Sequence, residues 1–208
     1  MKTYKPEEYK PSTRDVLLCL SYESQWLSLL KGLNKSYDGI LNPLQLVFDN
    51  RSFGALNDYS VKGISSVLGI KTSDVAKWSH RIYNDLFELN SNEPELFEAE
   101  GTRVDFSING LNTFAYFTLW LSVPLRQHEG FSWHFLKAKL RTAYFNVESV
   151  AHEYDAGIQT IRVHLNTYTP NIYRQFIYDK ALFYNLIPES SSISEYALEE
   201  RLRKIYPH

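Results

Sequence analysis

Residues 60–87 read SVKGISSVLGIKTSDVAKWSHRIYNDLF, and their residue spacing is the most informative in the chain. Ser60 is a residue type that caps helix N-termini, because its hydroxyl accepts a hydrogen bond from the first turn. Apolar residues then follow at helical spacing: Val61, Ile64, Val67 and Leu68. Gly69 comes next, and glycine most easily takes the left-handed conformation that follows a helix end. The spacing therefore predicts a short helix that stops at Gly69.

A second helix is predicted to begin almost at once after Gly69. Thr72 or Ser73 can cap its start. Its apolar residues fall on one stripe at steps of three and four: Val75, Trp78, Ile82, Leu86 and Leu89. Such a stripe is typical of a helix that is half-buried against a core.

Two helices joined by a tight turn that contains a glycine resemble the helix-turn-helix of bacterial and phage DNA-binding regulators. The resemblance lies in this segment alone. The residues that carry it are Ile64 and Leu68 on the first helix, small Ser65 at the helix crossing, Gly69 in the turn, apolar Ile70 after it, and Val75 with Trp78 on the second helix. The resemblance implies that the second helix enters the major groove of DNA.

The resemblance also nominates the outward residues near the start of the second helix as DNA-facing: Lys71, Thr72, Ser73, Ala76, Lys77 and His80. Four cations in residues 60–84, which are Lys62, Lys71, Lys77 and Arg81, stand against Asp74 alone. A local positive excess in a chain of formal net charge -2 is the electrostatic footprint expected of a DNA-binding face. Asp74 departs from the pattern, because a carboxylate in the first turn suits the helix dipole but repels phosphate.

A second interpretation of the same segment stays open. Two amphipathic helices of an ordinary helical core would show the same stripes, with Gly69 merely ending the first helix. The protein would then be a non-catalytic protein-interaction or structural module whose helical half only resembles a helix-turn-helix. An exposed, positive face shared by Lys71, Thr72, Lys77 and His80 would favour DNA binding over this alternative.

The composition of the whole chain is that of an ordinary globular protein. Of its 208 residues, 44% are hydrophobic and 22% charged, and it has 12 Phe, 15 Tyr and 4 Trp. Aromatic residues at this density can build a core without a disulfide or a metal, and the single Cys19 cannot pair within the chain. The longest apolar run, residues 114–125, is too short and too interrupted to span a membrane. We expect a soluble cytoplasmic protein with no cofactor and no membrane partner.

The first ninety or so residues are predicted to be helical. One helix is expected from Ser12 or Thr13 to about Leu30, and a shorter one from Pro43 to Phe48. Residues 91–101, SNEPELFEAEG, are acidic and contain a proline and a terminal glycine, which is typical of a junction. The predicted organisation is therefore a helical domain over 1–90, the junction over 91–101, and a second domain over 102–208.

The second domain is predicted to contain strands followed by helices. Strands are expected over 103–108, 112–123, 144–154 and 158–168, with turns at Asn109-Gly110 and at 155–157. Residues 131–140 fit a strand and a helix equally well. Helices are expected over 170–187 and, with a capping box from Ser192 to Glu195, over 192–205. The fold class is therefore α+β, with an antiparallel sheet of about four strands and C-terminal helices.

Signatures of catalysis are missing from the sequence. It has no glycine-rich phosphate loop, no paired cysteines, no G-x-S-x-G and no H-E-x-x-H. The best remaining set is Glu148, His152, Glu153 and His164, which are interpreted as solvent-facing strand residues, although a metal or proton-transfer role is conceivable. Aromatic residues at 114, 116, 117 and 120 could stack on bases, but such a run is more typical of a sheet core.

These observations lead to one principal hypothesis. The chain is expected to be a sequence-specific DNA-binding protein, a transcriptional regulator without catalytic activity, whose second domain senses a ligand, pairs with a second copy as a homodimer or binds a partner. The expected partner is double-stranded DNA.

Overall fold

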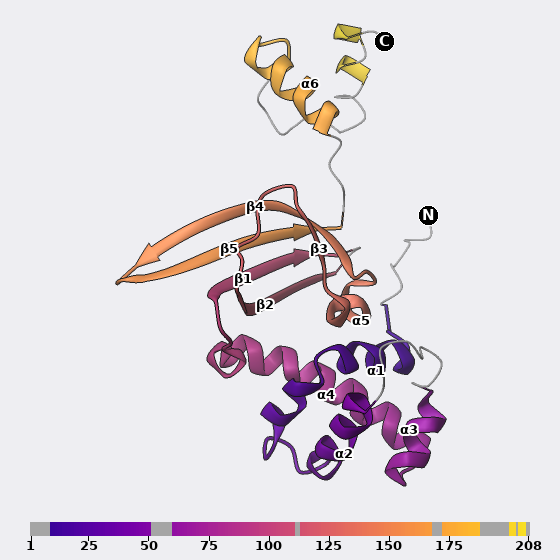
Figure 1. The fold of residues 1–208 in the computed structure, drawn as a ribbon. Helices are drawn as coiled ribbons and strands as arrows, with labels where there is room; N and C mark the ends of the chain where they lie inside the picture. The colour runs from indigo at the N-terminus through magenta and orange to yellow at the C-terminus, as the bar shows by residue number, and fades with distance from the viewer. Residues whose placement is uncertain are drawn as a thin grey trace, which may run out of the picture. The chain divides into compact units, whose positions relative to one another are not determined.

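The computed structural model describes residues 9–50, 60–110, 113–167, 172–187, 200–202 and 204–206. Within it the chain forms two compact units, Met1–Thr167 and Tyr168–His208. The first unit contains a helical layer and a sheet (Figure 1). The fold class is α+β, as the sequence predicts. None of the helices within the described ranges is both long and apolar enough to cross a membrane.

The helical layer of the first unit begins with a helix that is shorter than predicted. Helix α1 covers Thr13–Tyr22, and Ser12 caps it by accepting a hydrogen bond from the Asp15 N–H at 3.1 Å. At Glu23 the backbone leaves the helical region, and the chain continues as the 3-10 helix η1, Ser24–Leu30. Helix α2, Asp38–Asp49, begins before Pro43 and contains it. Helices α3, Val61–Leu68, and α4, Thr72–Asn92, follow, and then the short η2, Pro94–Phe97.

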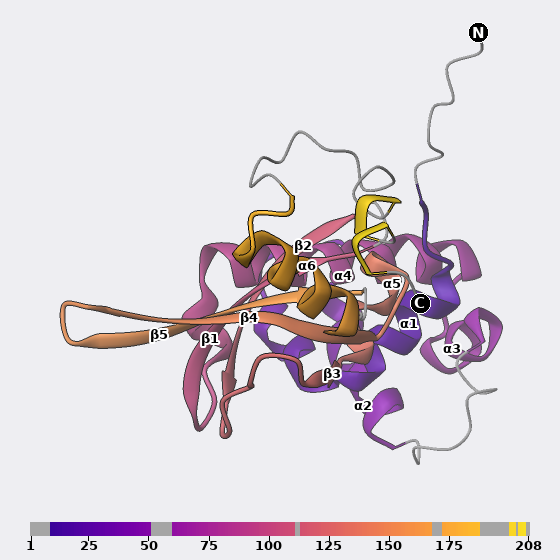
Figure 2. The ribbon, with the colours of Figure 1, turned by 90° about the horizontal axis from the view of Figure 1, so that it is seen from above.

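The sheet has five strands and is mixed, whereas an antiparallel sheet of about four was predicted. The strands are β1 Thr102–Asn109, β2 Phe114–Leu121, β3 Gly130–Ser132, β4 Tyr144–Asp155 and β5 Ile158–Asn166. Their order is β2-β1-β5-β4-β3, and β1 pairs with β5 in parallel. Two predicted hairpins are present, β1–β2 and β4–β5, and the latter turns at Ala156 and Gly157, both with positive φ. Figure 2 shows that the β4–β5 hairpin extends past the N-terminal end of β1.

The segment that fitted both a strand and a helix contains both. Residues 130–132 form β3, which pairs with β4. The 3-10 helix η3, His134–Leu136, and the short helix α5, Lys137–Leu140, follow directly. Of the alternating aromatic residues, Phe131 lies in β3, Trp133 follows the strand and Phe135 lies in η3, so the helical spacing describes the residues after Ser132.

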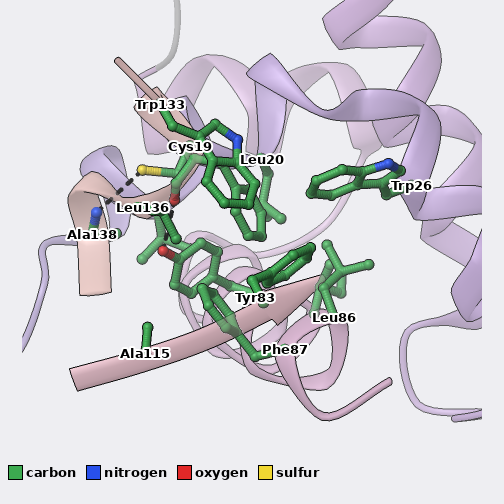
Figure 3. Packing of buried hydrophobic residues seen from close by; sticks show 14 of the residues in the cluster. Cys19, Leu20, Trp26, Tyr83, Leu86, Phe87, Ala115, Trp133, Leu136 and Ala138 are labelled. Atoms are coloured by element: carbon green, nitrogen blue, oxygen red, sulfur yellow. Dashed lines mark hydrogen bonds between the residues drawn. The ribbon is translucent and has the colours of Figure 1, made fainter. Parts of the chain in front are cut away.

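Helices and sheet of the first unit share one core. Figure 3 shows Trp26 of η1, Phe87 of α4 and Trp133, which follows β3, in one cluster of buried side chains. The Trp26 ring lies 5.3 Å from that of Phe117 on β2, and 5.2 Å from that of Phe97. Phe97 is only 5% exposed. Residues 91–101 therefore do not separate two cores, because this acidic stretch carries Phe97 into the common core; the chain instead divides after Thr167.

The second unit contains helix α6, Ile172–Phe183, and a small core of Ala181, Ile187 and Leu202. The helix predicted over 170–187 thus ends earlier, before a turn in which Asn185 has a φ of 54°. Residues 200–202 are helical, in agreement with the last predicted helix. The capping box predicted at Ser192 and Glu195 lies outside the described residues.

Candidate functional site

The turn between α3 and α4 has the geometry that its sequence predicts. The Ser60 Oγ accepts a hydrogen bond from the Gly63 N–H at 3.0 Å and caps α3. Gly69 has a φ of 65° and its N–H donates to the Ser65 carbonyl, which also accepts from the Ile70 N–H at 3.2 Å. At the start of α4, Lys71 holds the N-cap position without a side-chain bond, so the predicted capping by Thr72 or Ser73 is wrong.

The apolar residues of the motif are buried to different extents. Ile64 and Val75 are buried, whereas Leu68 and Trp78 are half-buried against the same core. Val67 was predicted to lie inward, but it is 62% exposed. The buried face of α4 centres on Ile82, Leu86 and their neighbours, which leaves Trp78 at its border.

The residues nominated as DNA-facing divide into two groups. Lys71, Thr72, Ser73 and Lys77 are exposed at the N-terminal part of α4. Ala76 and His80 are half-buried, and the His80 Nε2 lies 3.5 Å from the Thr13 Oγ1 of α1. Burial lowers the pKa of His80, which favours the neutral form of this imidazole. His80 therefore adds little positive charge to that of the exposed Lys71 and Lys77.

Arg81 continues the exposed line of Ser73 and Lys77 at the four-residue spacing of a helix. Its Nε lies 3.0 Å from the Asp85 Oδ1, and the Tyr37 hydroxyl donates to the Asp85 Oδ2 at 2.6 Å. Desolvation and the adjacent Asp85 raise the pKa of Tyr37. Asp85 thus offsets Arg81, and the excess positive charge of this face lies with Lys71 and Lys77.

A second group of polar side chains lies on the outer face of the sheet. Along β1, Val104, Phe106 and Ile108 point into the core, so Arg103, Asp105 and Ser107 point outward. The same alternation places Arg162 and His164 of β5 outward, together with Tyr116 of β2. The register sets Ser107 opposite both His164 and Tyr116, and Asp105 opposite both Arg162 and Thr118.

Hydrogen bonds and ion pairs connect these outward residues. The Asp105 Oδ1 accepts from the Arg103 Nε at 3.1 Å and from the Thr118 Oγ1 at 2.8 Å. Ser107 and His164 share a hydrogen bond between Oγ and Nδ1. The Arg162 NH2 lies 3.0 Å from the Glu153 Oε2. Most of these side chains, but not Glu153, line a hollow of about 430 Å³, which we call the β1/β5 hollow. Its lining includes Arg103, Asp105, Ser107, Tyr116, Arg162 and His164 from the sheet, together with Asn90, Ser91 and Pro94 from the end of α4 and the start of η2.

The set Glu148, His152, Glu153 and His164 does not form one site. Glu153 and His164 lie on the outer face, whereas His152 is paired in register with Ile161 of the inner face and contacts Gln159 at 3.0 Å. A bulge between Val147 and Ser149 displaces Glu148 from the regular alternation. Among the described residues, no group of three or more His, Cys, Asp or Glu side chains could hold a metal ion.

Sequence reasoning missed the β1/β5 hollow, although part of its signal was present. The alternation of 103–108 indicates which side chains of β1 point outward. The parallel pairing of β1 with β5 has no local signal, since it joins segments more than fifty residues apart.

Comparison with protein-family models, curated proteins and solved structures finds no match to this chain.

Proposed function

We propose that this chain is a sequence-specific DNA-binding protein, a transcriptional regulator without catalytic activity, that contacts double-stranded DNA through the N-terminal part of α4. The observation that carries the proposal is the exposed set Lys71, Thr72, Ser73 and Lys77 on a two-helix unit closed by the Gly69 turn. The lysines can bind phosphates or a guanine edge, and the hydroxyls suit backbone phosphates.

The first experiment is selection of bound sequences from a random pool of double-stranded DNA at moderate salt. The affinity for the selected sequence is then measured against salt concentration. Replacing Lys71 and Lys77 together by Ala removes two phosphate contacts, so the slope of log affinity against log salt should fall by up to about two. The matched control is Lys31→Ala with Lys35→Ala, two exposed lysines between η1 and α2. This control should leave the slope unchanged.

Two single substitutions separate the roles within the site. If Lys77 binds phosphate, Lys77→Ala should weaken binding to all DNA sequences equally. If Lys77 contacts a base, the substitution should relax the preference at one base position, at a cost of roughly 1–3 kcal/mol in binding free energy. Asp74→Asn removes a carboxylate from the first turn of α4 and should strengthen binding. Absence of salt-dependent affinity for any DNA in the micromolar range would refute the proposal.

The alternative function is a non-catalytic protein-interaction module. The observation that favours it is exposed apolar surface on the helical layer, where Leu46 of α2 is 60% exposed and Val67 of α3 is 62% exposed. A regulator that binds only through charge has no need of these side chains. If DNA selection fails, Val67→Ser should be compared with the unmodified chain in capture of a binding partner.

A further inference from the structure

The β1/β5 hollow differs from an ordinary solvent-facing sheet in its position and its groups. Strands β1 and β5 are interior strands of the sheet, each paired on both sides. Their outward residues include two arginines, a histidine, a serine and a carboxylate, which converge from separate segments of the chain. Convergence of polar groups on a hollow is typical of a ligand site, and its volume lies within the range of about 300–1,000 Å³ for small-molecule pockets.

We infer that the β1/β5 hollow binds a free nucleotide, a planar aromatic base joined through a sugar to a phosphate group. The inference is independent of DNA binding by α4, since it rests on other residues and another ligand. It goes beyond that function by giving the sheet a binding role of its own.

The phosphate is assigned to Arg162, with His164 beside it on the same strand. Arg162 is 58% exposed and its partner Glu153 is 48% exposed. Exposed ion pairs of this kind contribute little, so a phosphate can replace Glu153 at little cost. A guanidinium presents a planar fork of donors that matches two phosphate oxygens. Arg162 can therefore exchange a weak internal partner for a stronger external one.

The aromatic base is assigned to Tyr116. This side chain is 67% exposed and lies on β2 in the row that contains Ser107 and His164. The ring of Phe114 packs edge-on against it at a centroid distance of 4.3 Å, which limits the orientations of the tyrosine ring. An oriented, exposed aromatic ring is a stacking platform for a base. Tyr116 and Arg162 thus stand on opposite sides of β1, as a base and its phosphate require.

Asp105 lies on β1, between the strands that carry Tyr116 and Arg162, and is assigned to the sugar of the nucleotide. Both of its hydrogen bonds to described residues, from Arg103 and Thr118, go to the Oδ1. The Oδ2 can accept a hydrogen bond from a ribose hydroxyl, as carboxylates in nucleotide sites do. Arg103 is held by this carboxylate and lies 3.4 Å from Glu95.

The charge balance favours a free nucleotide over a nucleic-acid strand. Two guanidinium groups, Arg103 and Arg162, are paired with three carboxylates, Asp105, Glu95 and Glu153, so the face has no net positive field. A long polyanion needs such a field for counterion release. A single nucleotide needs one arginine, one ring and one acceptor, and the hollow has all three.

The test is calorimetric titration of the full chain with the common ribonucleoside monophosphates. At least one should bind with a dissociation constant below the millimolar range, and more tightly than the matching nucleoside or inorganic phosphate alone. Tyr116→Ala should weaken binding at least about fivefold through lost stacking. Tyr154→Ala is the matched control, since Tyr154 is 77% exposed near the tip of the β4–β5 hairpin. It should leave the affinity unchanged.

The Arg162–Glu153 pair supplies a control for folding effects. Arg162→Ala and Glu153→Gln break the same ion pair, but only the first removes the phosphate ligand. Arg162→Ala should lower the affinity about tenfold or more, whereas Glu153→Gln should preserve or raise it. A thermal unfolding curve on each variant separates loss of binding from loss of fold.

Three results would overturn the inference. They are absence of nucleotide binding up to millimolar concentration, equal loss of affinity in Arg162→Ala and Glu153→Gln, and tighter, strongly salt-dependent binding of a single-stranded oligonucleotide through the same residues. The double variant of Lys71 and Lys77 should bind the nucleotide normally. A failure of DNA binding is thereby distinguishable from a failure of nucleotide binding.

Discussion

Trp78 illustrates how the burial of a single side chain determines its contribution to stability. The helical stripe of α4 predicts that Trp78 is buried, but the side chain is half-buried at the border of the core. Trp26, in contrast, is 9% exposed and its ring contacts those of Phe97, Phe117 and Phe135. Two tryptophans of equal size therefore contribute unequally to stability.

We expect Trp26→Ala to lower the free energy of unfolding by about 3–5 kcal/mol, the range for a large aromatic side chain removed from a core. Trp78→Ala should cost less, about 1–3 kcal/mol, because water already reaches part of the ring. Urea unfolding followed by circular dichroism measures both values. Equal costs would show that Trp78 packs as deeply as Trp26.

Glu23 is a carboxyl group at the break between α1 and η1, and its Oε1 accepts a hydrogen bond from the Trp133 Nε1 at 3.0 Å. Burial raises the pKa of Glu23 above its ordinary value. The folded protein therefore holds this proton more tightly than the unfolded chain. Stability from Glu23 is fully present below the unfolded pKa and is lost as the pH rises through the folded pKa.

Glu23→Gln should consequently raise the stability at neutral pH, because the amide keeps an acceptor for Trp133 without a buried charge. The gain should disappear as the pH falls below the ordinary range of a glutamate, where the wild-type carboxyl is protonated in both states. Unfolding midpoints measured from acidic to neutral pH check this. A loss of stability that is the same at every pH would contradict it.

The turn at Gly69 belongs to the elements α3 and α4 together, since it sets where one ends and the other begins. Its φ of 65° costs little for glycine but roughly 1–2 kcal/mol for a residue with a Cβ. Gly69→Ala should therefore destabilise the first unit by that amount in urea unfolding. Gly39→Ala is the control, because Gly39 lies in α2 without a positive φ and has open space around an added Cβ. It should be neutral or stabilising.

Local signals explain why these elements were predicted from the sequence. Ser60, Gly69 and the stripe of α4 act through hydrogen bonds and periodicity within a few residues. The α3–α4 part of the candidate DNA site could be predicted from these local signals. The half-burial of His80 was not, because it depends on the distant Thr13 of α1. The parallel pairing of β1 with β5 could not be predicted either, because it joins segments that are distant in the sequence.

The chain as a whole depends on contacts that join its predicted halves. Asn90 near the end of α4 donates to the Thr118 carbonyl at 2.9 Å and accepts from the Thr118 N–H at 2.7 Å. Its amide thus pairs with the backbone of the edge strand β2, where an unpaired edge would invite association with other chains. Phe97 ties residues 91–101 into the same core. The acidic, proline-containing composition of residues 91–101 predicts a domain boundary. Composition alone does not show that one aromatic side chain in this stretch, Phe97, is buried in the core.

This shared core predicts how the first unit unfolds. A fragment of residues 1–90 would expose Trp26 and Phe87, whose rings pack against Phe117 of β2 in the whole chain. It should therefore fail to fold, whereas a fragment of residues 1–167 should fold and unfold in one cooperative transition. Tryptophan fluorescence and far-ultraviolet circular dichroism should report the same midpoint for the longer fragment. A cooperative transition in the shorter fragment would show that the helices hold a core of their own, and the boundary at 91–101 would then stand.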